Sequence, residues 1–185
     1  SEMCIRDRPK TEGLTGTDKQ FDDKLTSGLA WDLAFHHYIK NFGWGIFYSG
    51  YSSDSYYEKT NMDHNVLLSY IAPLFCTKYS FNKKWMINGE VGVGYLKFSD
   101  KISSGIEKGK TYVSTVGFNY GIAIEYKLNK HMGIGISFNE IVGSAFLKNI
   151  KMENVHSIIA YNDYDRINLN RLNLLGGIRF YFGDR

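Results

Sequence analysis

The sequence predicts an all-β fold, an antiparallel up-and-down β-barrel. The composition favours strands over helices, because 16% of the 185 residues are aromatic and the chain has 19 glycines but 2 prolines. Apolar and polar residues alternate over segments of about ten residues, which is the period of a strand with two unlike faces. No apolar run approaches the ~20 residues of a membrane-crossing helix. A chain of this length is sufficient for one domain.

The clearest alternation lies in the closing segment, residues 167–182. One face is apolar and ends in two phenylalanines, whereas the other carries Arg171, Asn173, Arg179 and Tyr181. About ten residues of such alternation suffice for a tilted strand to cross a bilayer. Outer-membrane barrels usually finish with a strand of this kind that ends in phenylalanine, so membrane insertion is the hypothesis to test against the upstream segments.

Three strands are predicted in the first half of the chain, at residues 28–38, 42–51 and 64–79. In the first two, large apolar residues occupy every second position: Leu29, Trp31, Leu33 and Phe35, then Phe42, Trp44, Ile46 and Tyr48. The third carries Val66 and Leu68 on one side. It also contains Pro73, which removes a ladder donor, so we expect a bulge or a bend there.

Three more strands are predicted at residues 85–98, 112–127 and 132–141. Every second residue of each is large and apolar, and the intervening positions are rich in glycine and small polar residues. In a narrow barrel the small residues belong inside, which assigns the large ones to the outer face. We therefore expect the following residues to face outward into lipid: Trp44, Val91, Ile122, Ile136 and Phe180.

The predicted connections alternate in length. Short turns at 39–41, 82–84 and 128–130 alternate with long polar connections at 52–62, 99–110 and 142–166. Outer-membrane barrels place tight turns on the periplasmic side and long loops outside. Such barrels also use even strand numbers. Seven strands therefore predict a transmembrane β-barrel of the eight-stranded type whose first strand is missing.

The N-terminal residues differ in character from the rest. Residues 1–9 have neither the apolar region of a signal peptide nor strand alternation. We interpret Ser1 to about Arg8 as a non-native junction, residues 1–26 as that junction plus a polar loop, and residues 27–185 as the barrel domain. Cys4 and Cys76 are far apart in sequence, and two unpaired thiols are favoured over a disulfide.

The sequence gives little support for catalysis, metal binding or nucleic-acid binding. The five histidines have no metal-ligand spacing: His36, His37, His64, His131 and His156. Adjacent histidines on a strand point to opposite faces, and no local grouping suggests a Ser/His/Asp triad. The formal charge of +3 is too small to indicate nucleic acid. We therefore expect no catalytic residue, cofactor or metal.

Four charged residues fall on the predicted inner face, namely Asp32, Glu90, Glu125 and Arg179. The interior of an eight-stranded barrel is just wide enough for side chains, so these charges must pair or cost several kcal/mol each. Arg179 and Glu125 each lie three residues from the end of a strand, at similar depth. We predict an ion pair between them, shared with Glu90 or capped by Tyr181, in a polar network that plugs the lumen.

Five short motifs carry a resemblance to a known family: Ser27-Gly28, Asn41-Phe42-Gly43-Trp44-Gly45, Tyr70-Ile71-Ala72-Pro73, Gly92-Val93-Gly94-Tyr95 and Gly176-Gly177-Ile178-Arg179-Phe180-Tyr181-Phe182. Their order over residues 27–182 resembles the small outer-membrane β-barrel proteins of Bacteroides-type Gram-negative bacteria, which are OmpA/OmpX-like in architecture. Two departures are the missing first strand with its signal peptide, and the extension at 183–185. The family has no catalytic residues to transfer.

The resemblance implies a non-enzymatic, monomeric protein of the cell outer membrane. Its partners would be outer-membrane lipid and, through the C-terminal strand, the barrel-assembly machinery, with extracellular loops as candidates for binding partners outside the cell. A soluble lipocalin-like ligand-binding barrel and an outer-membrane lipid-modifying enzyme remain alternatives. Aromatic residues at strand ends, such as Phe42, Trp85, Tyr126 and Phe182, favour the membrane over a lipocalin.

Overall fold

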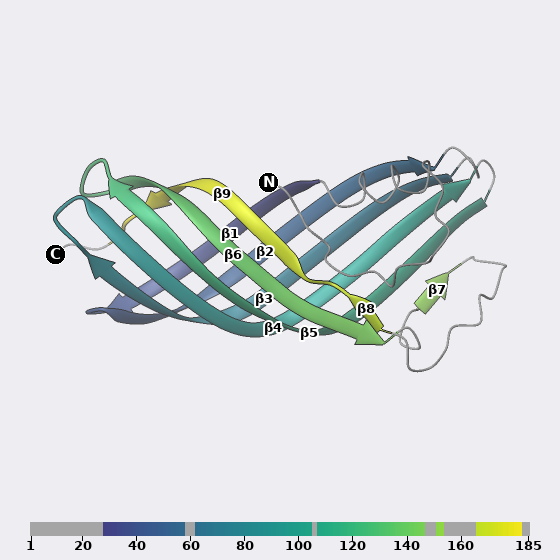
Figure 1. The fold of residues 1–185 in the computed structure, drawn as a ribbon, viewed down its shortest axis with the longest axis horizontal. Helices are drawn as coiled ribbons and strands as arrows, with labels where there is room; N and C mark the ends of the chain where they lie inside the picture. The colour runs from purple at the N-terminus through teal and green to yellow at the C-terminus, as the bar shows by residue number, and fades with distance from the viewer. Residues whose placement is uncertain (1–27, 58–61, 105–106, 147–150, 154–165, 183–185) are drawn as a thin grey trace, which may run out of the picture.

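The computed structural model describes residues 28–57, 62–104, 107–146, 151–153 and 166–182, which form one β-sheet without a helix (Figure 1). The strands are β1 (Leu29–Ile39), β2 (Phe42–Tyr57), β3 (Met62–Ser80), β4 (Trp85–Ser104), β5 (Glu107–Lys127), β6 (Met132–Phe146), β7 (Lys151–Glu153), β8 (Arg166–Asn168) and β9 (Arg171–Phe180). None of the described residues belongs to a helix capable of spanning a membrane. The predicted junction and polar loop at 1–26, Cys4, His156 and the extension at 183–185 lie outside the described residues.

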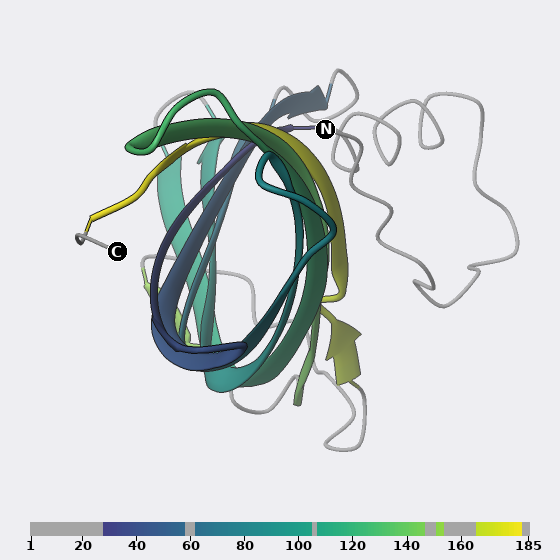
Figure 2. The same cartoon turned by 90° about the vertical axis from the view of Figure 1, so that its left-hand side faces the viewer.

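The sheet is an up-and-down meander that curls into a half-barrel (Figure 2). Strands β1 to β6 pair antiparallel in sequence order, and β8 and β9 both pair with β6 in one register, so they act as a single seventh strand. The short β7 pairs with β5. These pairings confirm the predicted all-β, antiparallel, up-and-down arrangement. Among the described strands β1 pairs only with β2 and β9 only with β6, so the half-barrel has two open edges.

The strands extend further than the sequence predicted at one end of the sheet. We expected long loops at 52–62 and 99–110, but β2 continues to Tyr57, β3 begins at Met62, β4 continues to Ser104 and β5 begins at Glu107. The predicted alternation between short and long connections is therefore wrong for these two hairpins. Buried Ser53 continues the period-2 pattern of the concave face into the extension of β2, where the outer residues Ser52 and Asp54 are polar.

Pro73 interrupts the ladder between β3 and β4 without producing a bulge. Ile71 is opposite Tyr95 and Leu74 is opposite Gly92, so the register is the same on both sides of the interruption. The two backbones approach closely at this point, because a Cβ on Gly94 would overlap the Ile71 carbonyl oxygen. The expected bulge is therefore replaced by a close approach that glycine permits.

The predicted facing of the strands is confirmed. The five residues expected to point outward are all exposed on the convex face: Trp44, Val91, Ile122, Ile136 and Phe180. The concave face of β4 and β5 carries buried Asn88, Gly92, Gly117 and Asn119, as the alternation predicted. The concave face of β3 differs, because it is apolar and contributes Leu68 to the buried cluster.

An apolar cluster lies on the concave side of the sheet. Its members come from β1 to β6 and from the segment after β8: Ala30, Phe47, Tyr51, Leu68, Tyr70, Ala72, Leu74, Cys76, Leu96, Val113, Ile141, Ala145 and Leu169. Cys76 is buried and free. The interior therefore combines this cluster with the polar groups described below.

Three tight turns join β1 to β2, β3 to β4 and β5 to β6 at one end of the sheet. Asn82 Oδ1 accepts hydrogen bonds from two backbone N–H groups, those of Lys84 and Trp85, both at 2.8 Å. Asn129 repeats this arrangement with the backbone of His131 and Met132. Side-chain acceptance by asparagine is a common way to form a turn. In the remaining turn Lys40 has φ 60°, as two-residue hairpin turns require.

Replacing Gly94 by alanine should destabilise the fold by about 1–3 kcal/mol, because the new methyl would meet backbone atoms that cannot move aside. The matched control is Gly177→Ala, since a Cβ on Gly177 would meet nothing within 4 Å. Urea unfolding followed by tryptophan fluorescence measures both variants. Equal stability of the two would contradict the close approach of β3 and β4.

Candidate functional site

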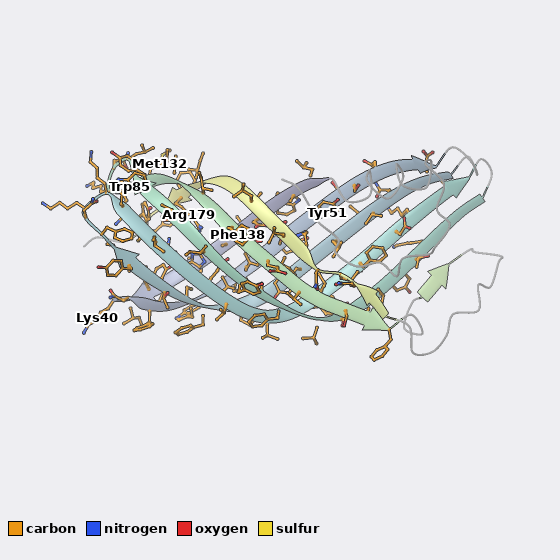
Figure 3. The ribbon with its side chains drawn as sticks, viewed as in Figure 1. Lys40, Tyr51, Trp85, Met132, Phe138 and Arg179 are labelled. Atoms are coloured by element: carbon orange, nitrogen blue, oxygen red, sulfur yellow. The ribbon has the colours of Figure 1, made fainter. Side chains whose placement is uncertain are left out.

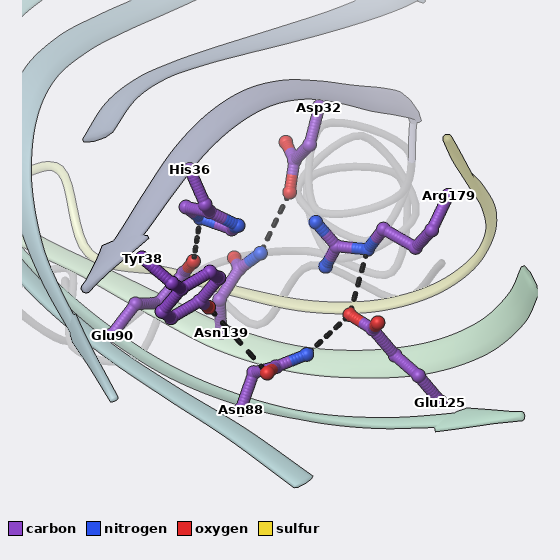
Figure 4. Close-up of polar contacts among 8 residues, drawn as sticks. All are labelled: Asp32, His36, Tyr38, Asn88, Glu90, Glu125, Asn139 and Arg179. Atoms are coloured by element: carbon purple, nitrogen blue, oxygen red, sulfur yellow. Dashed lines mark hydrogen bonds and ion pairs between the residues drawn. The ribbon is translucent and has the colours of Figure 1, made fainter. Parts of the chain in front are cut away.

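Three bonded groups of polar side chains on the concave face follow one another along β1 (Figure 4). Asp32, His36 and Tyr38 of β1 each belong to one group, and their partners come from strands across the half-barrel. Because side chains of one strand alternate between faces, these even-numbered residues share the concave side. They form the candidate site.

The group nearest the tight turns is centred on Glu125 of β5, a side chain 3% exposed. The Arg179 Nε atom of β9 lies 2.9 Å from Glu125 Oε1, and the Asn88 side-chain amide donates to the same oxygen. The Tyr181 hydroxyl, just beyond β9, donates to Oε2 at 3.1 Å. Burial and the neighbouring Glu125 carboxylate raise the pKa of Tyr181, so it remains a protonated donor. Tyr38 joins through Asn88 at 3.4 Å.

The middle group is a pair formed by His36 of β1 and Glu90 of β4. His36 Nε2 lies 3.1 Å from Glu90 Oε2, and the two side chains are 8% and 15% exposed. The pair joins strands that are not neighbours in the sheet, so it spans the concavity. It does not include Arg179, and Glu90 is therefore not shared with the Glu125 pair.

The third group contains the most deeply buried charge of the half-barrel, Arg171 of β9, which is 2% exposed. Its Nη2 atom donates to Ser49 Oγ, and Ser49 donates in turn to Asp32. Asn139 donates to the other Asp32 oxygen at 2.6 Å, and Asn173 donates to Asn139 at 2.8 Å. Because Arg171 lies on one edge strand and Asp32 on the other, this group connects the two open edges of the sheet.

The structure brings two of the four predicted site residues together. Glu125 and Arg179 form the predicted ion pair, with the predicted Tyr181 hydrogen bond. Asp32 and Glu90 lie on the same face but bond to Arg171 and His36 instead, so the four do not form one network. Arg171 was missed, although it shares the parity of Arg179 on the same strand and the alternation alone could have identified it.

The arrangement places Arg179 beside Glu125 and Arg171 near Asp32, and it bonds the third carboxylate, Glu90, to His36. Ser49, which contacts Asp32, also accepts from Arg171, whereas His36 is bonded to Glu90. A serine nucleophile requires a base within hydrogen-bond reach, and the described contacts of Ser49 include no histidine. Among the described residues no three His, Cys, Asp or Glu side chains are grouped to hold a metal ion.

The chain was compared with family models, with curated proteins and with solved structures, and none of the three comparisons finds a match. The function must therefore be argued from the distribution of side chains over the two faces of the sheet.

Glu125 and Arg179 should be energetically coupled. Arg179→Met would leave a buried carboxylate without its counter-charge and should cost about 1–3 kcal/mol, whereas the Arg179→Met/Glu125→Gln double variant should recover part of that loss. Urea unfolding of both single variants and the double variant completes the cycle. Additive losses would show that the two side chains do not interact.

Arg171→Met should cost more stability than Arg179→Met, because Arg171 is 2% exposed and Arg179 is 26% exposed. Removal of the guanidinium leaves Ser49 Oγ without the hydrogen bond from Arg171 and Asp32 without its nearby positive charge. Thermal unfolding of the two variants under identical conditions measures the order. The reverse order would mean that the contacts between the edges contribute little.

Proposed function

We propose that this protein is a non-enzymatic integral membrane β-barrel of the cell outer membrane, with a filled interior. The observation that carries the proposal is the distribution of hydrophobic residues. Among the described residues, 30 large hydrophobic side chains are exposed and 16 hydrophobic residues are buried. Soluble proteins seldom expose contiguous apolar surface on this scale, and such a surface indicates contact with lipid or protein.

The height of the apolar surface matches a bilayer. On β4 the convex positions from Trp85 to Tyr95 carry no charge, and on β5 the same holds from Val116 to Tyr126. Each segment has the ~9–11 residues that a tilted transmembrane strand requires. Beyond Tyr95 the convex face of β4 becomes polar, beginning with exposed Lys97.

Aromatic residues border this band, as in outer-membrane barrels. At the turn end Trp85 and Tyr126 pack with ring centroids 5.0 Å apart, on directly opposed positions of β4 and β5. At the other end Trp31 of β1 packs against Tyr48 of β2 with centroids 5.1 Å apart. Amphipathic rings favour the two interfaces of a bilayer, so both positions support the proposed span.

The two open edges support closure by one further strand, which gives the proposed eight-stranded barrel. Because the meander has seven strands, β1 and β9 run in the same direction, and a strand antiparallel to both would fill the gap. The Arg171 Nε atom is buried without a hydrogen-bond partner among the described residues. An inward polar group on a closing strand would supply its acceptor. Such a barrel would be inserted by the barrel-assembly machinery through its C-terminal strand, and would work as a monomer.

The filled interior favours a structural or partner-binding role over transport. The apolar cluster occupies one part of the concavity and the three polar groups occupy the rest. The extended hairpins β2–β3 and β4–β5 carry mixed charges beyond the apolar band, and they are the candidates for contact with an extracellular partner. A lipocalin-type barrel turns its apolar face inward, which is opposite to the arrangement here. The described polar contacts also give no support for a lipid-modifying enzyme.

Ile136→Arg should destabilise the lipid-inserted protein by about 2–4 kcal/mol, because an arginine on a lipid-facing strand loses its hydration near the bilayer midplane. Ser144→Arg is the matched control, an exposed polar position on the same strand and face that lies beyond Glu140. Urea unfolding of the protein in phosphatidylcholine vesicles measures both. If the two substitutions cost the same, the convex face of β6 does not contact lipid.

A further inference from the structure

The tight-turn end of the sheet carries a one-sided excess of positive charge. The turns and their flanking residues, 37–42, 77–85 and 126–132, contain six lysines and no aspartate or glutamate: Lys40, Lys78, Lys83, Lys84, Lys127 and Lys130. Lys40, Lys83, Lys84 and Lys130 are exposed. None of these four forms an ion pair with a described carboxylate. Glu125, the nearest acid on β5, is buried on the concave face and paired with Arg179.

At the opposite end of the strands, acidic residues and lysines are balanced. The polar extensions at 51–57, 62–66, 97–104 and 107–112 contain four acidic residues and four lysines. The tight turns and the polar extensions are both hydrophilic. A need for solubility alone therefore does not explain why the tight turns lack acidic residues. The two ends differ in the sign of the charge that they carry. A positively charged surface favours negatively charged partners.

The geometry of the turns does not require lysine. In two turns the asparagine side chain makes the hydrogen bonds that close the turn, and these bonds do not involve the lysine that follows it, Lys83 or Lys130. Lys40 has φ 60°, a conformation that glycine or asparagine adopts with less strain. The cationic side chains are therefore present for a reason other than the turn geometry.

The lysines border the aromatic edge of the apolar band. Lys84 Nζ lies 5.7 Å from the centre of the Tyr126 ring, and Tyr126 packs on Trp85. Figure 3 shows Lys40, Trp85 and Met132 at the same end of the half-barrel, each at one of the three hairpins. Cations directly beyond an aromatic belt would lie at the depth of lipid phosphate groups.

We propose that the three lysine-bearing turns bind the phosphate groups of anionic phospholipids in the leaflet that they face. This inference rests on the proposed membrane insertion and adds a lipid class and an electrostatic orientation to it. The occupant is an anionic lipid surface because the cations come from three separate turns around one rim, a layout that suits several headgroups at once. A lysine near an anionic surface strengthens association about fivefold, and several lysines act together.

The experiment measures which lipid contacts the turn end. The full chain, with Trp31→Phe so that Trp44 and Trp85 report from the turn end, is refolded into mixed phosphatidylcholine and phosphatidylglycerol vesicles. Brominated phosphatidylglycerol or brominated phosphatidylcholine then quenches the tryptophans on contact. We expect a preference of about threefold or more for phosphatidylglycerol at low salt, which falls as salt screens the charges.

The decisive comparison uses two triple variants with the same change in formal charge. Lys40→Gln/Lys83→Gln/Lys130→Gln removes one lysine from each turn and should abolish the preference. Lys97→Gln/Lys101→Gln/Lys110→Gln removes three lysines from the opposite end and should leave it intact. Lys40→Arg/Lys83→Arg/Lys130→Arg should keep the preference for phosphatidylglycerol. This variant also controls for misfolding caused by substitution at these three positions.

Two outcomes would overturn the inference while the proposed function stands. These are quenching without any preference for phosphatidylglycerol, and equal loss of the preference in both triple variants. An acidic protein partner would then be the better occupant of the turn end. If neither brominated lipid quenches the tryptophans, the chain does not insert, and both the proposed function and this inference fail.

Discussion

Because the sheet curls, its concave face has less space for side chains than its convex face. The distribution of large and small side chains follows from that constraint. On the concave face seven strands converge, so glycine, alanine, serine and asparagine recur there, as at Gly92, Gly117 and Asn119. On the convex face the strands spread, and large side chains fit without crowding. A sequence that alternates small and large residues therefore specifies both the curl and its direction. The same alternation places the hydrophobic residues outside, in contrast to a soluble sheet.

A charged side chain on the concave face pairs with a residue across the concavity, because its sequence neighbours on the same strand point to the convex face. Glu125 of β5 pairs with Arg179 of β9, and Asp32 of β1 lies near Arg171 of β9 through Ser49. These contacts hold distant strands at a fixed separation, which backbone pairing alone cannot do at open edges. Burial makes an unpaired charge costly. The buried charges therefore have to stay paired, and their pairing specifies how far the sheet curls. The polar groups contribute geometry more than net stability.

The strands, their faces and the Glu125–Arg179 pair could be predicted from the sequence because each depends on local parity. Counting from a strand end gave both the face and the depth of Arg179. The strand ends could not be predicted in the same way. The residues after Tyr51 are rich in serine, tyrosine and aspartate and resemble a loop, but β2 continues to Tyr57 with Ser53 buried on the concave face. Pro73 was expected to cause a bulge or a bend, and the register of β3 with β4 is the same on both sides of it. The Asp32–Arg171 contact depends on how the whole sheet curls, which no local pattern contains.

The interior, the extended hairpins and the tight turns of this sheet differ in how their charges are arranged. The difference bears on which end of the sheet would face which side of a membrane. Interior charges are paired, and the extended hairpins carry both signs in equal number. The three tight turns contain lysines and no aspartate or glutamate, although the backbone geometry of two of them is met by Asn82 and Asn129. A symmetric apolar band fits a bilayer equally well either way up, so shape and hydrophobicity cannot distinguish the two orientations. In the proposed membrane-inserted state the lysines of the turns break that symmetry, because exchanging the ends would exchange the charge that each leaflet meets. In this fold, electrostatics at the turns would thus supply the directional information that the apolar band lacks.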